Sequence, residues 1–500
     1  MKNSIVKSTI QVTVIVFIIK VMGFIKQSVV ASISGATRET DIYFMATSVI
    51  MALCLVCFSS ISVSFLSMYS ERLTLNGHDE ANNLLNSVLR FFVPISICVA
   101  LIFFCFSHQI SIILAPSYDL NEIKTLSKYI RYLSIMFIFF CYYLIINVVL
   151  EVEKLFLPGK GQNFFQNLFT IIAAVFFYRY YKISALIYAF IFAGFIQCIQ
   201  ITWSARKFFK IKKNIHSERK SIQKLISISL PLVVGNAIYE INDIVDKRIA
   251  SGLREGSIST LAFGASINEI VTTLVISSLS TILFTHFSIW VAEGKKEKIQ
   301  EVLINSLEYL LVVIMPIMIM CLVCSDCIIE ILYGRGNFGK QEIISTSGVV
   351  MGYAVGFFFQ ATRANIIRVY YAFQETKRPM INGLISVTIN VVLSIILSRY
   401  LGVAGIALAT SISMMIATLL LIPYLYRFFP NFSIVPSTIE FLKVMLVSLI
   451  IGILANIMRN KILAGSLLTI LLVGCFVVIS YMILLMIIKV KCIKRLITRK

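Results

Sequence analysis

The chain has 500 residues, of which 58% are hydrophobic and only 14% are charged, and its formal net charge is +21. No soluble core hides so much apolar surface, so a soluble fold is excluded. The basic residues are spread among short loops, which excludes nucleic acid as the expected partner. No catalytic triad or phosphate-binding glycine loop accompanies the four histidines, so we expect neither an enzyme nor a metal site.

Long apolar runs follow one another from end to end, for example at 133–150 and 467–488. A helix crosses a membrane with about 20 such residues, whereas a barrel strand shows alternation over about ten. The polar breaks predict about fourteen transmembrane helices. Their expected centres lie near residues 18, 55, 98, 140, 171, 193, 236, 273, 312, 359, 389, 414, 448 and 476.

Basic residues concentrate in alternate breaks, above all in the segment 204–224 and the tail 489–500. Because cytoplasmic loops carry the excess of lysine and arginine, and because the number of spans is even, we expect both termini in the cytoplasm.

A short internal repeat links the two halves of the chain. The residues at 31–39 read ASISGATRE after the first span, and those at 250–255 read ASGLRE after the seventh. Copies six spans apart have the same orientation, which predicts two parallel six-helix lobes. The fold class is therefore an all-α polytopic membrane protein with two additional C-terminal helices. We expect an N-terminal lobe at 1–205, a basic cytoplasmic linker at 206–224, a C-terminal lobe at 225–430, and the extra helices with the basic tail at 431–500.

Several charged side chains fall inside predicted spans, where they cost a few kcal/mol and normally face protein or water. Asp243 and Lys247 are four residues apart on the seventh span, within pairing range, so this stripe is as consistent with structural ion pairs as with a functional role. Lys20 lies near the middle of the first span, too deep to snorkel comfortably, and we expect it in a cavity. Lysine and arginine in such a cavity suit an anionic substrate, such as a pyrophosphate.

Short motifs in a fixed order carry a family resemblance. They are VMGF at 21–24, INDIVD at 241–246, LYGRGNF at 332–338, RVYYA at 368–372 and GIALATS at 405–411. With these motifs the chain resembles the MurJ/MviN lipid II flippases of the multidrug/oligosaccharidyl-lipid/polysaccharide exporter superfamily. The resemblance implies an inward-open cationic cavity and a groove formed by the last two helices. It also implies alternating access that moves an undecaprenyl-pyrophosphate-linked precursor from the cytoplasmic to the outer leaflet of the bacterial inner membrane.

The intramembrane charges and the resemblance together give the candidate residues. The expected substrate-binding set is Lys20, Lys26, Asp41, Glu269, Arg363 and Arg368. The expected ion-coupling set, for sodium or a proton, is Asp243, Asp246, Asn390 and Thr410.

The chain departs from the family pattern in its cavity residues. Relatives carry essential arginines in the first, second and eighth helices, whereas this chain has Lys20 and Lys26 in the first and Ser266 in the eighth. A lysine supplies a positive charge but cannot form the two parallel hydrogen bonds that an arginine guanidinium makes. A flippase for an O-antigen or capsule repeat unit is therefore an alternative. Two others are a cation-coupled drug antiporter, which needs an acidic cavity, and a scaffold that binds envelope-synthesis enzymes.

Overall fold

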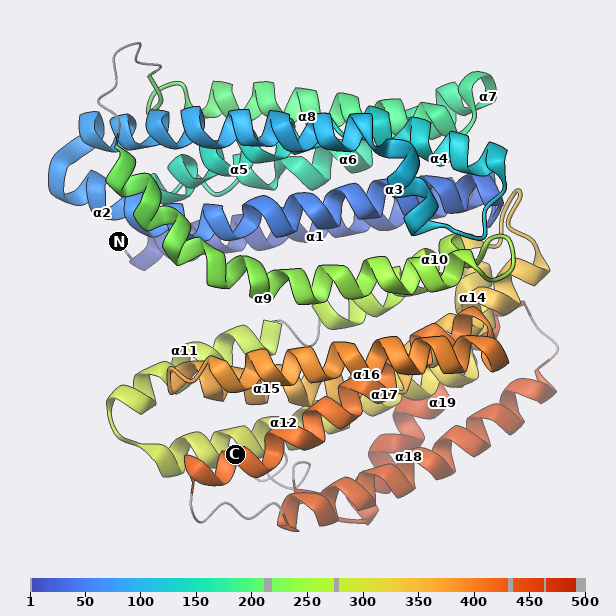
Figure 1. Cartoon of the computed structure of the whole chain (residues 1–500). Coiled ribbons are helices and arrows are strands. Elements are labelled where there is room, and N and C mark those ends of the chain that lie inside the picture. Colours follow the sequence, from blue (N-terminus) through green and yellow to red (C-terminus); the bar gives the residue numbers. More distant parts are fainter. Residues whose placement is uncertain (1, 211–217, 274–277, 430–434, 463–464, 492–500) are drawn as a thin grey trace. The chain divides into compact units, whose positions relative to one another are not determined.

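A computed structural model describes residues 2–210, 218–273, 278–429, 435–462 and 465–491 (Figure 1). Throughout this described part the chain is helical and contains no strand, which confirms the all-α prediction. The chain forms two compact units, Met1–Ser259 and Thr260–Lys500. The predicted lobe limits stay a prediction. Residues 211–217 of the predicted linker, 274–277 of the eighth span and 492–500 of the tail lie outside the described residues.

Unit 1 contains the helices up to the first turn of α10. They are α1 (Lys2–Ser34), α2 (Arg38–Cys105), α3 (Ser107–Leu114), α4 (Leu120–Leu133), α5 (Met136–Val152), η1 (Pro158–Lys160), α6 (Gly161–Ile172), η2 (Ala173–Phe177), α7 (Tyr178–Tyr181), α8 (Ile183–Ala205), α9 (Arg219–Ser251) and α10 (Ser257–Val271).

Helix α2 consists of two arms that meet at Gly77. A straight helix of 68 residues would be roughly 100 Å long, more than three times the hydrocarbon thickness of a bilayer. Gly77 has φ +81° and ψ −177°, a conformation open to glycine because it lacks a Cβ. Figure 1 shows α2 turning back on itself at its left-hand end, so its two arms are separate spans.

Helix α5 forms the centre of unit 1. Its side chains are mostly apolar, and Phe137, Ile146 and Leu150 are fully buried, as expected of a helix surrounded by protein. Both α2 and α8 pack against it. By contrast, α8 exposes Phe192 and Ile199, which is the pattern of a helix with one face toward lipid.

Unit 2 contains the remaining helices. They are α11 (Ser278–Ala292), α12 (Lys296–Val323), α13 (Ser325–Tyr333), α14 (Lys340–Ala354), α15 (Phe357–Ala372), α16 (Lys377–Leu401), α17 (Val403–Leu421), η4 (Ile422–Arg427), α18 (Val435–Lys461) and α19 (Ser466–Ile487).

The last two helices pack on α12 and α13 through one apolar cluster. Met315, Val447 and Val477 are buried in it. An ion pair between Arg459 and Asp326 joins α18 to α13 at its edge. The outer faces of α18 and α19 expose large apolar side chains such as Leu449 and Leu467, so these helices present apolar surface to lipid.

Within the described residues, ten helices are long and apolar enough to span a membrane, or eleven if the bent pair α14 and α15 is one span. The predicted count of fourteen is not confirmed. The difference arises where helices merge or break: α2 counts once although it bends at Gly77, and α6, η2 and α7 form a continuous helical stretch divided by a π-helical segment.

Candidate transport site

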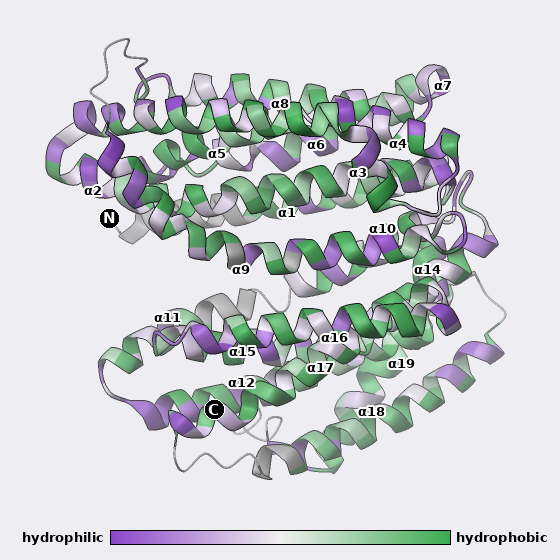
Figure 2. Ribbon diagram, viewed as in Figure 1, coloured by the Kyte–Doolittle hydropathy of each residue, from purple (hydrophilic) through white to green (hydrophobic). Residues whose placement is uncertain are grey.

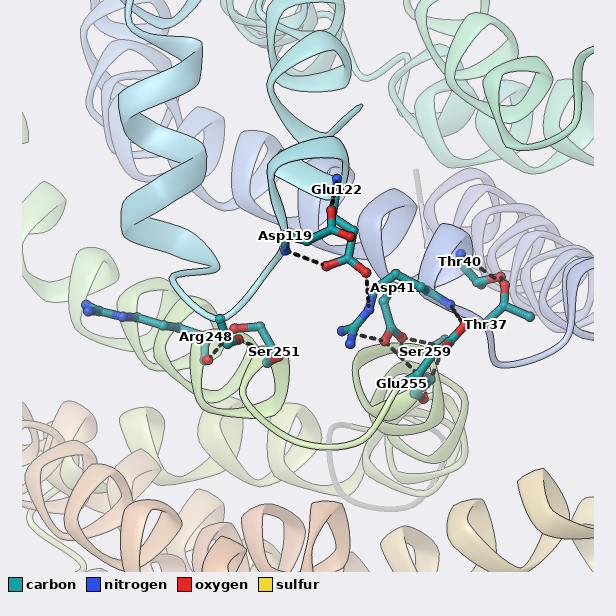
Figure 3. A network of polar contacts seen from close by, with 12 residues as sticks. Thr37, Thr40, Asp41, Asp119, Glu122, Arg248, Ser251, Glu255 and Ser259 are labelled. Carbon is teal, nitrogen blue, oxygen red and sulfur yellow. Dashed lines mark hydrogen bonds and ion pairs between the residues drawn. The ribbon is translucent and has the colours of Figure 1, made fainter. Parts of the chain in front are cut away.

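The beginning of α2 holds the beginning of α10 through a buried carboxylate. Asp41 is fully buried, and its side chain accepts hydrogen bonds from the backbone N–H of Gly256 (2.8 Å) and from the N–H and Oγ of Ser259 (2.7 and 2.6 Å) (Figure 3). The first N–H groups of a helix lack partners within the helix and carry partial positive charge. Asp41 therefore caps α10 with a full negative charge.

Gly256 makes this close approach possible. Its φ is +84°, and a Cβ at this position would lie 2.1 Å from the carbonyl oxygen of Ala36. Any other residue would be strained in its backbone and would also push the Ala36 loop away.

The contact is reciprocal. The backbone N–H of Arg38, in the first turn of α2, donates to Oε1 of Glu255 at 2.9 Å, while Asp41 accepts from the first turn of α10. Each helix start is thus capped by a carboxylate from the other segment. We call Arg38, Asp41, Glu255, Gly256 and Ser259 the α2–α10 latch.

The loop between α3 and α4 braces the latch. The Arg38 guanidinium lies 3.0 Å from Glu122 and 4.5 Å from the centre of the Tyr118 ring. Glu122 also completes a capping box with Asp119 at the start of α4, which fixes its position. Burial raises the pKa of the Tyr118 hydroxyl, so this side chain stays neutral at physiological pH. Ser117 donates to the carbonyl of Ser251 at the end of α9.

The latch changes the interpretation of one predicted residue. Asp41 was expected to bind substrate, but its carboxylate is buried beneath three donors, and the structure gives it a role in joining helices. Its part in substrate binding stays a prediction. Sequence reasoning missed Arg38 and Glu255 as partners, although both lie within the two copies of the repeat.

The predicted lysines of α1 are half-buried. The backbone next to Lys20 is fixed by α6, because Asn167 donates from Nδ2 to the carbonyl of Ile19 at 3.1 Å. Gly23 allows this packing, since a Cβ there would lie 3.2 Å from Asn167. Lys26 lies six residues after Lys20, about 120° away around the helix, so the two ammonium groups start from different faces of α1.

The charged stripe on α9 is arranged as its spacing predicted. Lys247 donates to Asp243 in an ion pair four residues apart, which confirms the predicted pairing. Asp246 is buried and accepts a hydrogen bond from Asn242 at 3.3 Å. The Asp243 carboxylate is therefore neutralised by a lysine, and Asn242 holds the Asp246 carboxylate one turn along the same helix.

In unit 2 the two predicted arginines have different surroundings. Arg363 is buried and donates from Nε to Asn382 Oδ1 at 3.1 Å, and Asn382 donates to the carbonyl of Ala417 at 2.8 Å. This chain of contacts joins α15, α16 and α17. Arg368 lies five residues further on, about 140° around the helix, and its guanidinium lies 5.5 Å from the Phe284 ring centre.

The structure brings Asn390 and Thr410 together. Asn390 Nδ2 donates to Thr410 Oγ1 at 3.0 Å between α16 and α17. On α10, Glu269 is exposed, and Ser266 forms a 2.7 Å hydrogen bond with Tyr333. These contacts place the residues but do not test their predicted roles.

Charged and amide side chains inside a bundle of apolar helices define a helical membrane transporter. The sequence model described as "Lipid II flippase MurJ" matches residues 30–491. The chain therefore belongs to the lipid II flippase MurJ family.

Curated relatives carry the same description over most of their length. The "Probable lipid II flippase MurJ" of Buchnera aphidicola subsp. Acyrthosiphon pisum is 26% identical over 435 residues, covering 85% of this chain and 84% of the relative. The protein of that description from Thermotoga maritima is 23% identical over 487 residues, covering 95% and 96%.

Solved structures agree on the fold. The structure described as "Lipid II flippase MurJ, inward closed conformation" aligns with a TM-score of 0.82 at 24% identity, over 96% of this chain and 98% of that one. An inward-facing multidrug resistance MATE family transporter of the MOP superfamily aligns with a TM-score of 0.70 at 11% identity, over 81% and 94%. The fold is thus shared across transporters with different cargoes, and fold alone does not select a cargo.

Proposed function

We propose that this protein moves lipid II from the inner to the outer leaflet of the bacterial cytoplasmic membrane. The observation that carries the proposal is the family match over residues 30–491. The basic residues within the spans support it chemically, because a pyrophosphate needs positive charge in a partly dehydrated site. The MATE relatives share only the fold at 11% identity, so the drug-antiporter alternative has no comparable support.

The residues proposed to serve substrate binding, by contact or by charge, are Lys20 and Lys26 on α1, Glu269 on α10, and Arg363 and Arg368 on α15. Among the arginines, Arg368 is the better candidate for direct contact. Arg363 is 7% exposed and bonded to Asn382, so its contribution is to fix α15 against α16 and supply background positive charge.

The α2–α10 latch is proposed to act as a gate. It lies at the end of α9 that carries Ser251, whereas the basic linker precedes Arg219 at the other end. A helix of 33 residues separates these ends by about 50 Å. If the basic linker is cytoplasmic, the latch seals the outer end, and export requires it to open.

Ion coupling is a further part of the proposal. Asp243 and Asp246 are the proposed carboxylates for sodium or a proton on α9; Asp246 is buried, and Asp243 pairs with Lys247. On α16 and α17, a hydrogen bond from Asn390 Nδ2 to Thr410 Oγ1 holds the two side chains together, and their oxygens are proposed as neutral ligands for sodium. These two arrangements are proposed separately.

We also propose that both termini face the cytoplasm, and that envelope-synthesis enzymes contact the loops. The basic segments at 204–224 and 489–500 support the orientation, since cytoplasmic loops carry such charge.

The test is complementation of a strain depleted of its own lipid II flippase. We expect the wild-type chain to restore growth and to prevent lipid II from accumulating in the inner leaflet. Parallel assays measure export of an O-antigen or capsule intermediate and efflux of cationic drugs. Restoration of only one of these other activities would refute the proposal and select the corresponding alternative.

A further inference from the structure

A cavity in unit 1 is lined by none of the predicted substrate-binding or ion-coupling residues. Its volume is about 420 Å³, within the range of roughly 300–1,000 Å³ typical of ligand pockets. The second arm of α2 and the beginning of α9 form its walls. The lining residues are Ser87, Arg90, Phe91, Glu218, Arg219, Ile222, Gln223 and Ile226.

The walls combine two kinds of chemistry. Arg90 and Arg219 are the basic residues of the lining, one from each helix. Phe91, Ile222 and Ile226 supply apolar surface beside them. A ligand that matches both walls must carry an anionic group directly attached to an apolar body.

The single acidic lining residue does not cancel the arginines. Glu218 lies 3.1 Å from Arg72 Nη2, which also donates to Ser221 Oγ at 3.2 Å. Arg72 has a second, longer contact of 3.9 Å with Glu80. The Glu218 carboxylate is thus engaged by an arginine outside the cavity, and Arg90 and Arg219 remain the two basic residues of the lining.

The cavity lies where both helices change from polar to apolar sequence. On α2 the polar stretch 78–90 gives way to the apolar run 91–105, and on α9 the basic turn 219–224 gives way to the largely apolar stretch 225–234. Figure 2 shows hydrophilic residues, in purple, at the turn of α2 and at the beginning of α9. In a bilayer such a transition marks the boundary between headgroups and hydrocarbon.

We propose that this cavity binds one anionic glycerophospholipid, distinct from the transported cargo. Arg90 and Arg219 hold the phosphate, and an acyl chain lies along Phe91, Ile222 and Ile226. The basic linker adjoins this end of α9, so by the positive-inside rule the lipid comes from the cytoplasmic leaflet, which is the leaflet with negative surface potential. A bound lipid would join the second arm of α2 to the first turns of α9.

The test uses native mass spectrometry of the full chain released from vesicles that contain phosphatidylglycerol and phosphatidylethanolamine. We compare Arg90→Gln with Arg219→Gln combined against Lys220→Gln with Lys224→Gln combined. Both double variants remove two positive charges, but the lysines are exposed residues of α9 outside the cavity lining. Retained phosphatidylglycerol should fall at least roughly tenfold in the arginine variant, the effect of losing a charge-assisted bond, and change little in the lysine variant.

Equal losses in the two variants would show diffuse surface attraction and overturn the proposal, as would no loss in either. If the double arginine variant does not unfold cooperatively, Arg219→Gln alone, at an exposed position, must reproduce the selective loss. Two competitors identify the ligand. Displacement of the lipid by inorganic phosphate would show a simple anion site, and preferential displacement by undecaprenyl pyrophosphate would assign the cavity to the cargo. Either result overturns the proposal.

Discussion

Asp41→Asn should weaken the α2–α10 latch selectively. The carboxylate accepts three hydrogen bonds within a buried site, and each bond to a charged acceptor contributes about 1.5–3 kcal/mol. An asparagine keeps the shape, but it loses the charge and turns an N–H₂ group toward donors. We expect at least about 3 kcal/mol of destabilisation at this contact, equivalent to an increase of roughly 150-fold in local opening.

Hydrogen exchange measured by mass spectrometry checks this directly. Peptides that contain the amides of Gly256 and Ser259 should exchange faster in Asp41→Asn, while peptides from α5 should not change. The matched control is Glu39→Gln, which makes the same chemical change two residues away at an exposed side chain. If both variants exchange equally, Asp41 does not hold α10 and the latch argument fails.

Three further predictions concern the transport residues. Lys20→Ala should abolish complementation while Lys20→Arg retains much of it, because either cation supplies a bond worth roughly ten- to a hundredfold in binding; full activity of Lys20→Ala would remove this lysine from the mechanism. Asp246→Asn should abolish the dependence of flipping on the ion gradient, measured in vesicles with imposed sodium or proton gradients, and an unchanged dependence would rule Asp246 out as the coupling acid. Asn382→Leu should lower the free energy of unfolding by about 1.5–3 kcal/mol in chemical denaturation, since it removes the amide oxygen that accepts a buried hydrogen bond from Arg363, and a loss below about 1 kcal/mol would contradict this role.

Sequence reasoning succeeded where the determining distance lies within one helix. The apolar runs predict helices because each backbone polar group in lipid must be satisfied within its own segment. The pairing of Asp243 with Lys247 follows from a spacing of four residues, and the structure confirms it. Neither prediction requires knowledge of how the helices pack against one another.

Contacts between helices were not predictable from the same patterns. Arg363 meets Asn382 only because α15 and α16 pack in one particular register, and no periodicity within either helix specifies that register. The same holds for Arg38, whose partner Glu255 lies 217 residues away in the sequence. The repeat identified both segments as related, but a parallel orientation of the two copies does not imply that they are in contact.

The reciprocal arrangement of the latch bears on how it opens. Its four hydrogen bonds run in both directions between the beginnings of α2 and α10. Separating the two helix starts therefore breaks all of them together, which favours two discrete states over gradual loosening. Three of the four involve the buried Asp41 charge, so spontaneous opening is rare at about 1.5–3 kcal/mol for each bond. A ligand shifts such an equilibrium only by binding the open state more tightly. If the latch acts as the proposed gate, cargo or the coupling ion must supply this difference in binding free energy.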